Sequence, residues 1–63
     1  MDDDALFNII KKAIMDEHKA YEFYLKAASA TTNIEAKKFF EGFAAQELKH
    51  EGDLEELYKK LRP

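Results

Sequence analysis

The chain has no cysteine, and glycine and proline are rare: Gly42, Gly52 and Pro63 are the only examples among 63 residues. The absence of cysteine excludes disulfides, cysteine-ligated zinc sites and thiol catalysis, and it fits a reducing compartment. Glycine and proline are the residues that most often interrupt regular structure. Because they are rare and no strand-type alternation is visible, the sequence predicts long helices.

A basic excess and long apolar runs are also missing. The net charge is −3 and 37% of the residues are charged, with no basic stripe, which argues against a nucleic-acid partner. No apolar run approaches the length of a membrane span, so we expect no membrane partner. The first residues, Met1-Asp2-Asp3-Asp4, are acidic and unlike a targeting peptide. We therefore expect a cytoplasmic protein.

Good helix formers run from about residue 4 to 30. The aspartates at positions 2 to 4 suit a helix N-terminus through capping and the helix dipole. Thr31-Thr32-Asn33 interrupts this pattern, with two β-branched hydroxyl residues and an N-cap candidate. The sequence thus predicts one all-α domain over residues 1–63, an antiparallel hairpin with helices at about 4–30 and 34–61 and a turn at about 31–33.

Each predicted helix carries one acidic residue near the centre of its apolar stripe. At about 100° per residue these are Glu17 and Glu47, and His50 lies one turn beyond Glu47 on nearly the same face. Glu17 and Glu47 are symmetric about residue 32, so both should lie about 20 Å from the turn. A carboxylate on a buried face is costly unless a partner compensates it. A metal ion is the usual compensation beside a histidine, and we therefore predict Glu17, Glu47 and His50 as metal ligands.

The apolar stripes are too wide for two helices alone. Each covers a third or more of its helix, which suits a four-helix bundle, and a two-fold homodimer is the simplest way to build one. Such a dimer contains four carboxylates and two imidazoles, the ligand set of di-iron and di-manganese bundle proteins. Oxygen and imidazole ligands suit iron, manganese, cobalt or zinc. We expect two metal ions per dimer, while the orientation of the two hairpins and any larger oligomer stay open.

Three segments resemble rubrerythrin and its ferritin-like relatives: Ala13-x-x-x-Glu17-x-x-Ala20-x-x-Phe23-Tyr24, Glu35-Ala36-Lys37-Lys38-Phe39-Phe40 and Glu47-Leu48-Lys49-His50. The resemblance covers nearly the whole chain but only half of the usual four-helix domain. It implies that Glu17, Glu47 and His50 bind iron, and that Tyr24 matches a tyrosine just outside the ligands. It also implies oxidation of Fe(II), reduction of peroxide, or iron storage.

The chain departs from the family pattern in three respects. Its half length is similar in plan to encapsulated ferritins, whose short chains pair to form the di-iron site. It lacks a rubredoxin-like cysteine domain, so peroxide reduction would need an external electron donor. In their second helix pair, rubrerythrins also carry an extra carboxylate one turn after a first-helix ligand, where this chain has Ala20. This difference argues against rubrerythrin-type peroxidase chemistry.

The leading hypothesis is a di-iron carboxylate protein that oxidises Fe(II) and/or reduces peroxide or oxygen at a dinuclear site shared across a homodimer. Its enzyme class would be ferroxidase or rubrerythrin-like peroxidase. The alternatives are a metal-binding or iron-storage module with little turnover, and a structural bundle with a vestigial site. His18 is expected at the surface, and Glu51 either joins the site or reaches solvent at the bundle edge. Phe23 and Phe39 either seal the bundle flank or form a contact between dimers.

Overall fold

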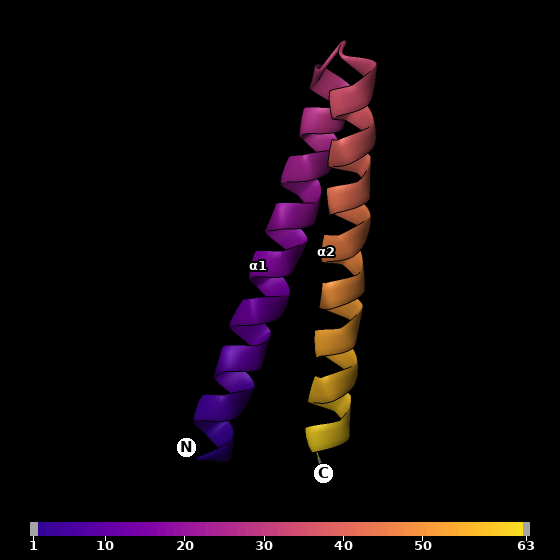
Figure 1. Ribbon diagram of the computed structural model, residues 1–63. Coiled ribbons are helices and arrows are strands. Elements are labelled where there is room, and N and C mark those ends of the chain that lie inside the picture. The colour runs from indigo at the N-terminus through magenta and orange to yellow at the C-terminus, as the bar shows by residue number, and fades with distance from the viewer. Residues whose placement is uncertain (1, 63) are drawn as a thin grey trace.

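The computed structural model describes residues 2–62, which form two α-helices, α1 (Asp3–Ala30) and α2 (Ile34–Leu61). The helices run antiparallel, lie close together at the turn and spread apart toward the two termini (Figure 1). The hairpin is elongated, with extents of 47 × 15 × 13 Å. The predicted all-α hairpin is therefore confirmed. The outer limits of the predicted domain, residues 1 and 63, lie outside the described residues.

Side-chain caps fix where the two helices begin. The carboxylate of Asp2 accepts a hydrogen bond from the backbone N–H of Ala5 at 2.7 Å. The side chain of Asn33 accepts one from the backbone N–H of Ala36 at 2.9 Å. Each cap satisfies one of the N–H groups that a helix start leaves without an internal partner. Thr31 ends α1 with an extended backbone, so the turn requires only three residues.

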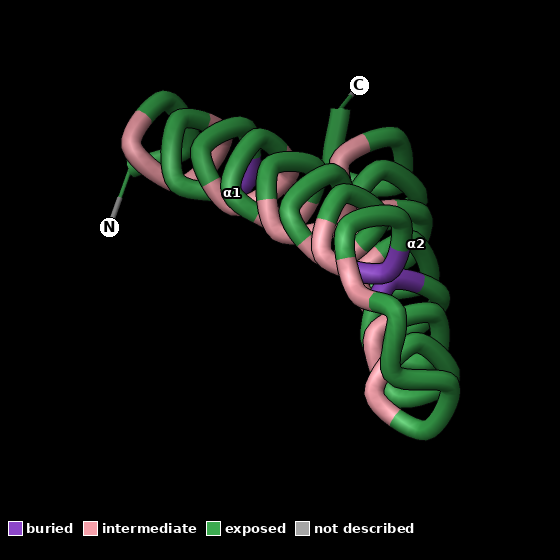
Figure 2. Tube along the Cα trace, turned by 90° about the horizontal axis from the view of Figure 1, so that it is seen from above, coloured by how far each residue is buried: buried purple, intermediate pink, exposed green. Residues whose placement is uncertain are grey.

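The hairpin has a thin core. Within residues 2–62 the buried residues are Ile10, Ala28 and Ala44, and most of the chain is exposed (Figure 2). Ten large apolar side chains are at least 40% exposed. Neither described helix is long and apolar enough to cross a membrane. A chain of this size buries little surface even when compact, so much of the apolar surface of the single hairpin stays exposed to solvent.

Aromatic side chains form a continuous surface near the turn. The ring centroid of Tyr24 in α1 lies 5.5 Å from that of Phe23 and 5.4 Å from that of Phe43 in α2, and the Phe43 ring lies 6.2 Å from Phe39. We call Phe23, Tyr24, Phe39 and Phe43 the aromatic strip. Phe23 and Phe39 are 64% and 60% exposed. The strip therefore crosses both helices and presents its two ends to solvent.

Candidate metal centre

Glu17, Glu47 and His50 come together midway along the hairpin. Glu17 lies on α1, and Glu47 and His50 lie one turn apart on α2. Each can offer one ligand atom, and these atoms lie within 4.8 Å of one another. Nδ1 of His50 is 3.4 Å from Oε2 of Glu17 and 3.9 Å from Oε2 of Glu47. The structure thus brings together the three residues predicted as ligands, while metal binding itself stays a prediction.

The two carboxylates of this cluster are largely shielded from water. The side chains of Glu17 and Glu47 are 28% and 22% exposed, whereas that of His50 is 55% exposed. Among the described residues, the buried Oε2 of Glu17 has no hydrogen-bond partner. Leaving such an oxygen unpaired is costly, and a bound cation would compensate it. Two carboxylates and an imidazole are also the donor types that iron and similar divalent metals accept, so the residues fit a metal.

Glu17 raises the pKa of Glu47. Hydrogen bonding with the Glu17 carboxyl is the main cause, because it favours the protonated form of Glu47. Burial and charge repulsion from Glu17 act in the same direction, and His50 opposes them. Two neighbouring carboxylates without a cation therefore retain a proton more readily than an isolated one. Metal binding has to displace that proton, so the affinity for metal should rise with pH.

Tyr24 lies in the aromatic strip, two helical turns closer than Glu17 to the turn that joins α1 and α2. Its ring stacks at 6.4 Å on that of Phe40 and contacts Phe43. The aromatic packing agrees with a half-buried core position. The predicted contact between the Tyr24 hydroxyl and a ligand carboxylate stays a prediction.

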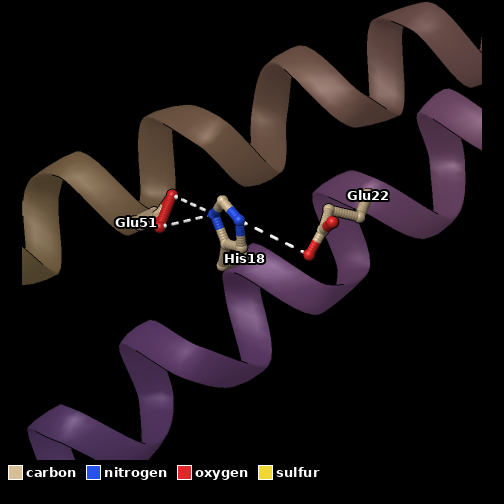
Figure 3. A network of polar contacts seen from close by, with 3 residues as sticks. All are labelled: His18, Glu22 and Glu51. Carbon is tan, nitrogen blue, oxygen red and sulfur yellow. Dashed lines mark hydrogen bonds and ion pairs between the residues drawn. The ribbon is translucent and has the colours of Figure 1, made fainter.

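A second polar cluster, made of His18, Glu22 and Glu51, adjoins the centre. Nδ1 of His18 lies 2.9 Å and 3.2 Å from the two carboxylate oxygens of Glu51, across the hairpin (Figure 3). Nε2 of His18 faces Oε1 of Glu22 at 3.4 Å. The His18 side chain is half-exposed, as expected, and that of Glu51 is only 13% exposed. The sequence analysis did not predict this pairing, although both residues fall on the same flank of the hairpin.

We expect the metal-free protein to lose stability as the pH rises above 6.5. The hydrogen bond to Glu51 raises the pKa of His18 above 6.5, so the stabilisation is complete below 6.5 and is lost as the pH passes the raised pKa. The pKa of Glu47 is also raised from its ordinary value of 4.5, so Glu47 too makes the folded state less stable as the pH rises above 4.5. Thermal melts from about pH 5.5 to about 8.5 measure this trend. In His18→Ala the melting temperature should fall less above pH 6.5 than it does in the wild type. A wild-type melting temperature that does not fall with pH would contradict the prediction.

Comparison with known proteins identifies the family of the chain. The family model described as Rubrerythrin matches residues 8–63, a segment that includes Glu17, Glu47 and His50. Comparisons with curated proteins and with solved structures find no match. The match confirms the family resemblance of the sequence and covers nearly the whole chain. The chain therefore belongs to the rubrerythrin family.

Proposed function

We propose that this chain provides half of a dinuclear iron centre and that a second copy completes it. Each copy contributes Glu17, Glu47 and His50, which lie within 4.8 Å of one another. The main supporting observation is the buried Oε2 of Glu17, which lacks a hydrogen-bond partner among the described residues. Four carboxylates would balance the charge of two divalent cations. Iron is the metal that the rubrerythrin family typically binds, and manganese, cobalt or zinc are the expected substitutes.

The exposed surface beside the centre supports pairing with a second copy. At about 100° per residue, Phe43, His50 and Phe39 lie roughly 40°, 60° and 80° from Glu47 in the same direction around α2. His50 is 55% exposed and Phe39 is 60% exposed. A copy that covers the aromatic strip would therefore also cover the open side of the metal ligands. Its own ligands would then face Glu17 and Glu47, as a four-helix carboxylate bundle requires.

The residues suit Fe(II) oxidation in particular. When bound, a pair of ferrous ions supplies two electrons to oxygen or peroxide. Glu17 and Glu47 would hold the ions through carboxylate oxygens, and His50, whose Nδ1 faces both carboxylates, would hold them through an imidazole nitrogen. We propose oxidation of Fe(II) as the reaction, with reduction of peroxide dependent on an external electron donor.

Ala20 favours a second candidate function, an iron-storage module with little turnover. By the resemblance to rubrerythrins, Ala20 stands where their second helix pair carries an extra carboxylate, so the chain lacks a group that this resemblance assigns to the peroxidase members. Steady-state consumption of peroxide with an added electron donor separates the two functions. Sustained turnover supports the enzyme, whereas a single stoichiometric oxidation of bound Fe(II) supports storage.

Metal content per chain tests the proposal directly. We expect about one iron per chain in a dimer, by elemental analysis and native mass spectrometry. Glu47→Ala should lose the iron because it removes one ligand from each copy. Glu56→Ala is the matched control, since Glu56 lies on the same helix, is exposed and pairs with Lys60 at 3.9 Å. A metal-free dimer that does not take up Fe(II) would overturn the proposal.

A further inference from the structure

We propose that His18 and Glu51 are positioning residues for the metal centre, because their hydrogen bond links α1 to α2 directly beside the ligands. We call this contact the His18–Glu51 bridge. The inference rests on the proposed metal centre and adds two residues to it. Neither residue is proposed as a ligand. Their effect is to hold Glu17 at a fixed distance from Glu47 and His50.

The bridge is attached to the ligand segments at both ends. His18 directly follows Glu17 in α1, and Glu51 directly follows His50 and lies one turn beyond Glu47 in α2. Figure 3 shows the contact passing from one helix to the other. Any shift of α1 against α2 at this level therefore moves the ligands and strains the bridge together.

Both edges of the His18 ring are restrained. Nδ1 lies within hydrogen-bond distance of both oxygens of Glu51, and Nε2 faces Glu22 one turn along α1. The Glu51 side chain is 13% exposed, so little water is available to replace the imidazole. The bridge is thus a restrained contact between the two helices.

The metal centre needs such a restraint because its own residues repel one another. Glu17 and Glu47 bring like charges together midway along the hairpin, which disfavours close approach of the helices when no cation is present. The buried apolar residues of the described chain lie to either side of this level, with Ile10 toward the termini and Ala28 and Ala44 toward the turn. The helices also spread toward their termini (Figure 1). The bridge opposes separation at the level where the ligands have to meet.

Titration with Co(II), followed by its visible absorption, tests the inference in the full-length chain. His18→Ala and Glu51→Ala should each weaken binding about tenfold, the lower end of the loss seen when a group that supports metal ligands is removed, and should alter the absorption band. The double variant should bind no more weakly than either single variant, because both remove one contact. Glu51→Gln keeps an oxygen that accepts from Nδ1–H and should bind nearly as the wild type does. Glu51→Asp keeps the negative charge, but its side chain is too short to reach His18, so it should bind Co(II) more weakly than the wild type.

The controls separate the bridge from the centre and from the fold. Lys49→Ala breaks an ion pair of 2.8 Å with Asp53 that stays within α2, so it should leave Co(II) binding unchanged. Circular dichroism tests whether the variants are as helical as the wild type. If an alanine variant loses helicity, the Co(II) affinity of Glu51→Asp decides whether the bridge supports the metal centre. Wild-type affinity and absorption in the bridge variants, with binding lost in Glu47→Ala, would overturn only the bridge. Binding that survives Glu47→Ala would overturn the metal centre and the role of the bridge with it.

Discussion

Loading with Fe(II) under anaerobic conditions should raise the melting temperature by about 10–20 °C. A ligand that binds only the folded state at about a hundred times its dissociation constant stabilises it by about 2.7 kcal/mol, and about 1 kcal/mol shifts the melting temperature of a small domain by roughly 4–8 °C. This gain is large relative to the total free energy of unfolding, because the core is thin: Ile10, Ala28 and Ala44 are the buried residues of the described chain. The metal also removes the repulsion between Glu17 and Glu47.

Thermal melts with and without a chelator measure the effect, and Glu47→Ala is the control. That variant should melt at one temperature whether or not metal is present, because it cannot hold the ion. The pH provides a second check. The gain in melting temperature from metal should grow as the pH rises, because metal binding has to displace the proton that Glu47 retains beside Glu17, while the metal-free protein becomes less stable. Equal melting temperatures for the metal-free and metal-loaded wild type would contradict the prediction.

The hairpin and the meeting of the three predicted ligands could be predicted because both follow from properties of single helices. Few glycines and one proline leave the two helices uninterrupted, and Asn33 caps the second one. Because the turn has only three residues, it fixes how far each residue lies from the turn along the hairpin. Equal distances from this turn place Glu17 beside Glu47, and the helical period places His50 on the same face.

The His18–Glu51 bridge could not be predicted in the same way. A helical wheel gives the direction of each side chain but not its rotamer, and the bridge depends on two long side chains that cross between helices. His18 and Glu51 lie on one flank, yet their shared flank alone does not determine that the two side chains meet. The spreading of the helices toward the termini is also a property of the pair, since it depends on how the side chains between them pack.

Phe39→Ser should weaken the proposed dimer by roughly a hundredfold. Full burial of a phenylalanine contributes about 1.5–3 kcal/mol; because dimerisation can bury only the exposed part of the ring, and a two-fold interface contains the residue twice, the loss is about 2.7 kcal/mol. Phe39 is 60% exposed in the single chain and ends the aromatic strip, so its contribution to the hairpin itself is small. Sedimentation over a range of protein concentrations measures the dissociation constant.

Leu48→Ser is the matched control. Leu48 is 48% exposed on the same helix, but it lies about 100° from Glu47 in the direction opposite to Phe39, so its loss should leave the dimer intact. Dissociation by Leu48→Ser and not by Phe39→Ser would place the partner on the flank of the His18–Glu51 bridge. Metal content should follow dimerisation. Phe39→Ser keeps Glu17, Glu47 and His50, yet it should lose iron when diluted below its dissociation constant, because a centre shared between two chains cannot persist in one.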